Sequence, residues 1–232
     1  MSDIAAESQS RSRRRRRGGE AAPKPPFLSE QLEWGAASYL DNPTEPVNEE
    51  GVEAIHEASM RVLEDVGILF LNDDALDVLE AAGCTVDRET KRVRMDRNFV
   101  TDMAAKAPAT FTITPRNPDR EITVGGRQFN FGQVASAPNV MDLDRGRRVG
   151  NRADYQDLLR LSQAYNCIRF NSGYPVEPID IHASIRHLDA HYDMLTLTDK
   201  VIHAYSLGPE RIEDVMEMAR IAGGLTAGEF EA

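Results

Sequence analysis

Apolar residues recur with helical spacing over residues 48–66, and polar residues fill the positions between them. The apolar positions of this segment are Val52, Ile55, Leu63 and Val66. Further helices are predicted over residues 72–82 and from residue 96 to about 107, with a short strand at residues 92–95. The residues that can cap these three helices are Asn48, Asn72 and Asp96. We therefore expect a helical α+β extension over residues 27–109.

The pattern changes to short apolar pairs separated by turn signals over residues 110–149. Asn117-Pro118-Asp119, Gly125-Gly126 and Asp144-Arg145-Gly146 mark the turns. These features predict a β-rich segment of hairpins. One strand of this segment, near residues 138–143, is also a candidate for a parallel strand of the next segment.

From residue 150 onward, helices and strands alternate. Helices are predicted over residues 152–165, 180–196 and 209–222, and strands over residues 168–172 and 201–206. The strands recur about every 33 residues, the spacing of a βα repeat with parallel strands. Two or three such units do not close a barrel. We therefore expect an α/β fold that continues beyond residue 232.

Charge divides the chain into two parts. Residues 1–26 carry a net charge of +4, and the remainder carries −15. The first part is rich in Ser, Arg, Gly, Ala and Pro, which predicts a disordered arginine-rich tail. Residues 13–17 are all arginine, and they either form a solvated tail or bind RNA, lipid head groups or a partner protein. The acidic body argues against a nucleic-acid partner, because a phosphate backbone requires a basic face.

Composition also bears on the compartment. No apolar run approaches the roughly 20 residues that span a membrane, and no apolar stretch follows the arginines as in a signal peptide. The only cysteines, Cys84 and Cys167, rule out a disulfide framework, and both are interpreted as structural. These observations predict a cytoplasmic protein with no membrane partner.

The loop of residues 173–178 carries the most suggestive chemistry. It directly follows a predicted strand, and in a βα barrel that position faces the active site. Tyr174 and Glu177 suit a cationic ligand, because an aromatic face and a carboxylate both attract a quaternary ammonium group. The alternative is a stiff, proline-bounded loop that only caps the barrel.

Three histidines, His182, His187 and His191, cluster in the following segment. The last two are four residues apart on one helix face, so a metal site is one interpretation. A polar helix face is the other, and because the glutamate of the HExxH signature is missing, no metal site is predicted. Neither a phosphate-binding glycine loop nor a Gly-x-Ser-x-Gly elbow is present, so these classes of nucleotide-binding protein and hydrolase have no support.

Several segments, taken in order, resemble the trimethylamine methyltransferase (MttB-type) family of corrinoid-dependent methyltransferases. The resemblance covers residues 48–230. The segments that carry it are Ile55-His-Glu-Ala, Val62-Leu-Glu-Asp-Val-Gly67, Phe131-Gly132, Ala137-Pro-Asn-Val-Met-Asp-Leu143, Pro175-Val-Glu-Pro178, Arg186-His-Leu-Asp189 and Thr198-Asp-Lys200. Each motif is weak alone, and the ordered set is more specific.

The resemblance implies the N-terminal part of a TIM (β/α)8 barrel, preceded by the small α+β extension and incomplete in this chain. Residues 110–149 then lead into the barrel, and residues 150–232 form its first βα units. It further implies a methyltransferase of methylamine metabolism that moves a methyl group from trimethylamine or a glycine betaine-like quaternary amine to Co(I) of a corrinoid. That corrinoid is carried by a separate partner protein, so this chain is expected to bind no cofactor directly.

In family members that act on trimethylamine, the resemblance implies a pyrrolysine in the second half of the chain, which this sequence does not include. Because many relatives lack it, a glycine betaine-like substrate is favoured. Seven residues are candidates for substrate binding, namely Asn139, Asn171, Tyr174, Glu177, Arg186, His187 and Ser206. The family resemblance assigns no catalytic residue.

Two alternatives stay open. The chain is either a catalytic part that is inactive without the C-terminal half of the barrel, or a non-catalytic module that binds a partner protein. A homo-oligomer is also open, because a half barrel would expose a strand edge and apolar faces.

Overall fold

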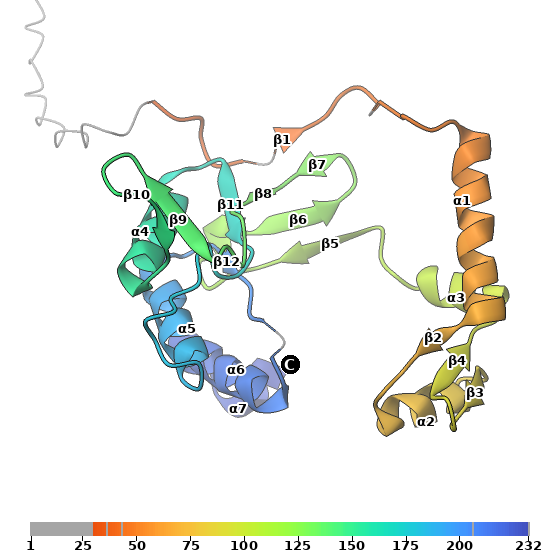
Figure 1. Cartoon of the computed structure of the whole chain (residues 1–232). Coiled ribbons are helices and arrows are strands. Elements are labelled where there is room, and N and C mark those ends of the chain that lie inside the picture. The colour runs from red at the N-terminus through yellow and green to blue at the C-terminus, as the bar shows by residue number, and fades with distance from the viewer. Residues whose placement is uncertain (1–29, 36, 43, 206, 232) are drawn as a thin grey trace, which may run out of the picture.

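The structure, a computed structural model, describes residues 30–231 apart from Ala36, Pro43 and Ser206. The arginine-rich segment 1–26, predicted to be disordered, lies outside the described residues. Within the described part, the chain forms two groups of elements, which Figure 1 shows on opposite sides of a β-rich link. Residues 48–108 make up one group, and the other contains the parallel strands and their helices.

Local capping rules account for the helices of the first group. Helix α1 (Glu49–Arg61) begins after Asn48, whose side chain accepts a hydrogen bond from the backbone N–H of Gly51 at 3.0 Å. The helix continues as a π-helical turn, η1 (Val62–Val66), and ends at Gly67, where φ is +74°. Both predicted boundaries are confirmed.

The rest of this group surrounds a small core. Helices α2 (Asp73–Ala81) and α3 (Arg97–Ala104) are capped by the side chains of Asn72 and Asp96, as predicted. A three-stranded antiparallel sheet lies beside them, in the order β2 (Ile68–Leu69), β4 (Arg92–Arg94), β3 (Thr85–Asp87). The buried apolar residues of this core are Leu76, Cys84 and Val93.

The apolar face of α1 is not covered by any part of the chain that the structure describes. The exposed fractions of Val52, Ile55 and Val66 are 57%, 61% and 53%. An amphipathic helix normally places such residues on a core. Here α1 and η1 are tied to α3 through Arg97, which pairs with Glu57 at 3.0 Å and Glu64 at 2.9 Å. The predicted helix is therefore present, but the apolar residues of α1 and η1 remain exposed.

The predicted β-rich segment contains two hairpins, while its strand β7 (Gln128–Phe129) pairs with a strand outside the segment. Strands β5 (Thr110–Ile113) and β6 (Ile122–Gly125) pair antiparallel around a short 3-10 turn, η2 (Pro118–Arg120). Two further antiparallel pairs are β7 (Gln128–Phe129) with β1 (Ala37–Ser38), and β9 (Asn139–Asp142) with β10 (Gly146–Val149).

The second group is built on three parallel strands, in the order β12 (Val201–Ile202), β11 (Ile168–Asn171), β8 (Phe131–Gly132). Helix α4 (Arg152–Ala164) precedes β11, and α5 (Arg186–Leu197) connects β11 to β12. Helices α6 (Pro209–Gly223) and α7 (Ala227–Glu231) follow β12. Parallel strands joined through helices make this group an α/β structure, as predicted.

The strand near residues 138–143 is not part of the parallel sheet, so that alternative was wrong. This segment is β9, and it turns back at Gly146, where φ is +66°. The carboxylate of Asp142 accepts hydrogen bonds from the backbone N–H groups of Asp144 and Arg145, which fixes the turn. The third parallel strand is β8 instead.

Two elements are shorter than predicted. Helix α5 begins at Arg186, because turns centred on His182 occupy the preceding residues: the backbone N–H groups of Ile185 and Arg186 both bond to the carbonyl of His182. Strand β12 ends at Ile202 rather than at residue 206, because its pairing partner β11 ends at Asn171.

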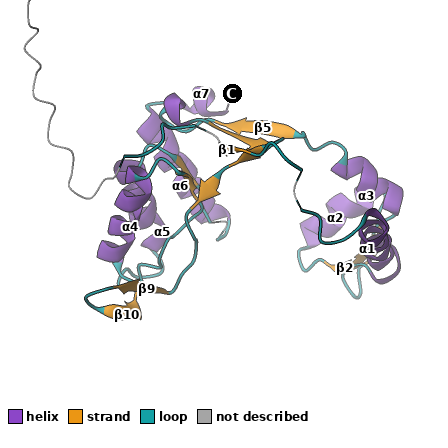
Figure 2. Ribbon diagram, turned by 90° about the horizontal axis from the view of Figure 1, so that it is seen from above, coloured by secondary structure: helices purple, strands orange, loops and turns teal. Residues whose placement is uncertain are grey.

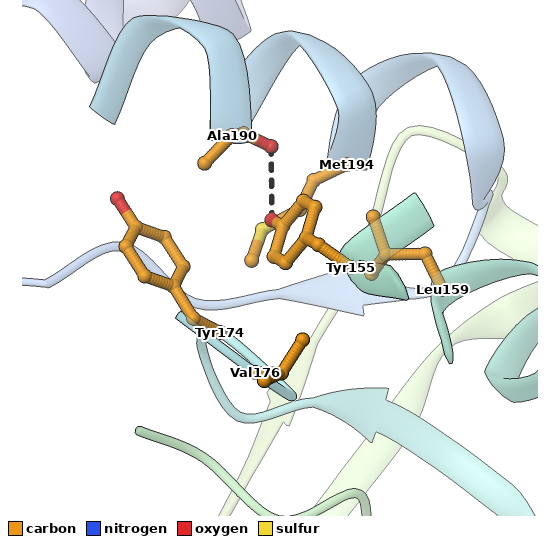
Figure 3. Packing of buried hydrophobic residues seen from close by; sticks show 6 residues of the cluster. All are labelled: Tyr155, Leu159, Tyr174, Val176, Ala190 and Met194. Atoms are coloured by element: carbon orange, nitrogen blue, oxygen red, sulfur yellow. Dashed lines mark hydrogen bonds between the residues drawn. The ribbon is translucent and has the colours of Figure 1, made fainter. Parts of the chain in front are cut away.

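The main core lies between α4, α5 and the loop after β11. Its buried members are Tyr155, Leu159, Tyr174, Val176, Ala190 and Met194 (Figure 3). The Tyr155 hydroxyl donates a hydrogen bond of 3.0 Å to the carbonyl of Ala190, which satisfies its one buried polar atom. Figure 2 shows α4, α5 and α6 gathered on one side of the strands. This packing holds the loop after β11 in place.

At the amino ends of β11 and β12, residues 31–34 lie against the chain, with hydrogen bonds that join Gln31 and Leu32 to Ala164 and Asn166. Trp34 lies there against three cations: its ring centroid is 4.3 Å from the guanidinium carbon of Arg169, 4.5 Å from that of Arg120 and 5.4 Å from Lys200 Nζ. Arg169 and Lys200 are both buried. The aromatic face therefore stabilises cations that burial would otherwise destabilise.

Candidate functional site

The carboxyl ends of β11 and β12 lead into a cleft of about 330 Å³. Four of the predicted site residues line it, namely Tyr174, Glu177, Arg186 and His187. The first two come from the loop after β11, and the other two come from the first turn of α5. The chain segments that follow parallel strands thus meet at one edge of the sheet, as expected for an α/β structure.

Two tyrosine rings form one wall of this cleft. The ring centroids of Tyr174 and Tyr205 are 4.8 Å apart, and their planes are nearly perpendicular at 88°. The Tyr205 hydroxyl lies 2.6 Å from Ser136 Oγ and accepts a hydrogen bond of 3.1 Å from the Tyr174 backbone N–H. On its other side Tyr174 packs edge-on against Tyr155, at 5.7 Å. The tyrosine pair is therefore fixed by both packing and hydrogen bonds.

Gly173 is required where it stands, for two reasons. Its φ of +116° lies in the region that favours glycine, and a Cβ there would lie 2.5 Å from the Tyr205 hydroxyl. The close approach of the backbone lets Tyr205 reach the Tyr174 N–H. The glycine thus sets the geometry of the tyrosine pair.

Glu177 supplies a negative charge beside the tyrosines. Its backbone N–H donates a hydrogen bond of 2.9 Å to the carbonyl of Ala137, which holds the loop, and its carboxylate is 3.5 Å from the Arg186 guanidinium. Arg186 also donates to the carbonyl of Ile181, at 3.0 Å and 3.3 Å. Both side chains are half-buried. The carboxylate is therefore positioned, and it remains accessible to a cation in the cleft.

His187, in the first turn of α5, also lines the cleft. Its exposed fraction is 7%, and its Nε2 lies 2.8 Å from a carboxylate oxygen of Asp214 in α6. The neighbouring His191 is more deeply buried, and its ring nitrogens have no hydrogen-bond partner among the described residues. Burial lowers the pKa of His191 to about 4, so this imidazole is neutral at pH 7.

Burial also keeps the tyrosine in its neutral form. Desolvation, followed by the nearby Glu177 carboxylate, raises the pKa of Tyr174 to about 12. A neutral phenol presents an uncharged aromatic ring with a negative face. The cleft therefore combines aromatic faces and one carboxylate, which attract a small organic cation, with the guanidinium groups of Arg186 and Arg211.

The other three predicted residues do not line this cleft. Asn171 is fully buried: its carbonyl oxygen accepts a hydrogen bond of 2.8 Å from Ser162 Oγ, so it connects β11 to α4. Asn139 lies in the β9–β10 hairpin, paired with Val149. Ser206 lies outside the described residues.

Three polar lining residues were not predicted, namely Ser136, Tyr205 and Arg211. Tyr205 follows β12 as Tyr174 follows β11, so the same positional rule would have found it. Tyr205 was not predicted as a site residue because the predicted strand over residues 201–206 included it. Ser136 and Arg211 carry no local signal in the sequence.

The three histidines of the metal interpretation do not come together. Among the residues that the structure describes, no three His, Cys, Asp or Glu side chains are placed to share a metal ion. His182 Nδ1 is instead 2.7 Å from Ser184 Oγ. None of the described helices combines the length and the apolar character needed to cross a membrane.

Comparison with known proteins adds an independent line of information. A family model described as trimethylamine methyltransferase (MTTB) matches residues 9–232. The glycine betaine methyltransferase of Desulfitobacterium hafniense (strain Y51) is 36% identical over 178 residues, which cover 77% of this chain and 37% of that protein. The trimethylamine methyltransferase MttB of Desulfitobacterium hafniense (strain DSM 10664 / DCB-2) is 28% identical over 179 residues, which cover 76% of this chain and 36% of that protein.

A third relative is the proline betaine:corrinoid methyltransferase of Eubacterium limosum. It is 30% identical over 138 residues, which cover 58% of this chain and 27% of that protein. The matched part of the chain thus spans between about a quarter and little more than a third of the length of these relatives.

Proposed function

The chain belongs to the trimethylamine methyltransferase family, and from this premise we propose that the protein moves a methyl group from a methylated amine to a corrinoid carried by a partner protein. The relatives named above are methyltransferases of methylated amines and betaines. In this proposal the cleft at the carboxyl ends of β11 and β12 holds the amine. Tyr174, Tyr205 and Glu177 bind it.

The observation that carries the proposal is the perpendicular tyrosine pair beside a carboxylate. Two aromatic faces at 88° can contact a tetrahedral ammonium group from two directions. Each such contact contributes roughly 0.5 to 2 kcal/mol, depending on how far the cation is desolvated. Glu177 adds a charge of opposite sign in the same lining. These groups attract a permanently charged amine, while Arg186, which is paired with Glu177, and Arg211 add positive charge to the same lining.

The chemistry places few demands on acid or base groups. In a quaternary ammonium compound the C–N bond breaks with its electron pair remaining on nitrogen, so the amine leaves neutral and needs no proton. A cobalt(I) corrinoid, when bound through its partner, supplies the nucleophile. The residues of this chain would hold the cation, orient one methyl group outward and exclude water. A raised pKa at Tyr174 is compatible with this role, because the phenol is not asked to transfer a proton.

The residues of the cleft fit an amine better than they fit the corrinoid itself. The imidazole in the lining belongs to His187, which is nearly buried and is oriented by Asp214. An imidazole held in this way is not presented to solvent as a cobalt ligand. This supports a cofactor that stays on the partner protein and approaches the cleft from outside.

We further propose that β8, β11 and β12 are strands of a (β/α)8 barrel. Their parallel order and the α5 crossover support this architecture. A cleft at the carboxyl ends of the strands is also where barrel enzymes carry their active sites. The length of the relatives leaves room for the remaining strands.

A methyl-transfer assay tests the proposal. The purified protein, in its full reading frame, is mixed with a corrinoid protein reduced to cobalt(I), and loss of the cobalt(I) absorbance is followed after addition of glycine betaine or trimethylamine. We expect transfer from one of them. Glu177→Gln should raise KM at least about tenfold, because removal of the carboxylate also leaves the Arg186 charge facing the substrate cation.

Glu213→Gln on the exposed surface of α6 is the matched control and should leave KM unchanged. Absence of transfer from every methylated amine tested, with an active corrinoid protein present, would refute the proposed function. An unchanged KM in Glu177→Gln would refute the assigned site.

A further inference from the structure

The two arginines that line the cleft differ in their pairing. Arg186 faces Glu177 at 3.5 Å. The remaining lining cation is Arg211, and no carboxylate among the described residues lies within 4.0 Å of its guanidinium group. The cleft therefore contains one positive group whose counter-charge is not supplied by the described part of the protein.

The position of Arg211 adds to this positive character. It is the third residue of α6, a helix of 15 residues, and Leu207 just before the helix lines the same cleft. The helix begins after Gly208, which has no side chain to cap the first backbone N–H groups. The start of a helix carries a partial positive charge, which favours an anion nearby. The side of the cleft next to α6 is thus suited to a carboxylate.

We propose that the cleft binds a zwitterion, with the quaternary ammonium group against Tyr174, Tyr205 and Glu177 and a carboxylate on Arg211. This inference rests on the proposed function and assigns to Arg211 the recognition of the substrate carboxylate, which betaines carry and simple amines lack. Arg211 is then the residue that determines specificity. A guanidinium group forms two parallel hydrogen bonds with a carboxylate, so the amine would be held at a fixed distance and orientation.

Discrimination against simple amines follows from the same geometry. Trimethylamine and tetramethylammonium offer nothing to Arg211, so binding either one desolvates the guanidinium group without supplying a partner. A betaine avoids this penalty. Arg211 is also close enough to the tyrosine pair to act on it, since its charge opposes the rise in the pKa of Tyr174. The two halves of the proposed site therefore lie within electrostatic reach of each other.

Isothermal titration calorimetry with three probes tests the inference on the full-length protein. Glycine betaine carries both charges, and tetramethylammonium carries only the positive charge. In 3,3-dimethylbutanoate a neutral carbon replaces the ammonium nitrogen of glycine betaine, so only the carboxylate charge is kept. The variants are Arg211→Ala and Arg211→Lys. Arg160→Ala, which removes an arginine that pairs only with Asp157 on the exposed side of α4, is the matched control.

In Arg211→Ala, we expect binding of glycine betaine to weaken roughly 10- to 100-fold, the loss typical of a charged hydrogen-bonded pair. Tetramethylammonium should bind the variant at least as well as the wild type. Arg211→Lys should restore part of the betaine affinity, which a purely structural role of Arg211 would not explain. 3,3-Dimethylbutanoate, which keeps only the carboxylate, should also bind Arg211→Ala more weakly than the wild type. Arg160→Ala should leave the affinity for all three probes unchanged.

Two other outcomes are distinguishable. If the wild type binds tetramethylammonium as tightly as glycine betaine, and Arg211→Ala changes neither, the inference is wrong while the cation site and the proposed function stand. If the wild type binds no quaternary ammonium compound at all, the proposed function fails, and the inference fails with it.

Discussion

Replacing Lys200 with methionine should abolish a pH dependence that the folded chain carries above neutral pH. Lys200 is only 2% exposed, and its Nζ donates hydrogen bonds to the backbone carbonyls of Ser162 and Tyr165 at the end of α4. Burial, reinforced by the positive charge of Arg120, lowers the pKa of this ammonium group from 10.5 to about 8. In the unfolded chain, this ammonium group has its ordinary pKa of 10.5.

The sign and size of the effect follow from this difference. Between about pH 8 and pH 10.5, the unfolded state binds a proton that the folded state has released, so stability rises with pH in this window. The gain is complete above pH 10.5 and is lost as the pH falls through 8. The full difference corresponds to roughly 3 kcal/mol, of which about 2 kcal/mol lies between pH 7 and pH 10.

The assay is urea unfolding at pH 7 and pH 10. Trp34 is the only tryptophan of the chain and lies 5.4 Å from Lys200 Nζ, so its fluorescence reports on this region. The wild type should gain about 2 kcal/mol more than Lys200→Met on going to pH 10. The two carbonyls that methionine leaves unpaired cost the same at both pH values and cancel. Lys106→Met, at an exposed position, is the control. Equal pH dependence in wild type and Lys200→Met would refute the reasoning.

Three further substitutions test the packing of the cleft and of the opposite end of the sheet. Gly173→Ala should lower the free energy of unfolding by about 1 to 3 kcal/mol in urea titration, because of its positive φ and the clash with Tyr205; Gly228→Ala, where nothing lies within 4 Å, should be neutral or stabilising. Tyr205→Phe should cost about 1 kcal/mol of stability through its lost hydrogen bonds. Calorimetry should show that it binds tetramethylammonium within about threefold of the wild type, because the aromatic face is kept; a loss as large as that in Tyr205→Leu would contradict a cation–π role. Trp34→Leu should lower the midpoint of thermal unfolding, since three cation contacts worth about 0.5 kcal/mol or more each are removed, and an unchanged midpoint would show that they contribute nothing.

Elements set by local rules could be predicted from the sequence. A side-chain oxygen at Asn48, Asn72 or Asp96 satisfies backbone N–H groups only a few residues away, so each cap is visible in the sequence and is found in the structure. Strand partners are not local. The segment 139–142 has the apolar character of either a hairpin strand or a parallel strand, and only its pairing with residues 146–149 decides between them.

The same distinction explains the candidate site. Tyr174 and Glu177 were found because they directly follow a well-formed strand, and that position has a known meaning in an α/β structure. Asn171 was predicted as a possible hydrogen-bond partner of a substrate carboxylate, but it lies within β11 and its side chain bonds to α4 rather than lining the cleft. Arg211 could not have been found, because its role depends on α6 folding back beside α5. Contacts between distant parts of the chain, rather than residue type, therefore decide which of these residues line the cleft.

The two ends of the parallel strands carry different kinds of charge arrangement, and this allows stability and binding to be separated. At the amino ends of the strands, Lys200 and its neighbours are buried against Trp34, and this arrangement affects the free energy of unfolding. At the carboxyl ends, Arg211 lines an open cleft without a described counter-charge. Since no hydrogen bond or ion pair among the described residues joins the two groups, their effects should be independent. Lys200→Met should therefore change unfolding without changing betaine affinity, and Arg211→Ala should do the reverse; a double variant with non-additive effects would show that the cleft is coupled to the opposite end of the sheet.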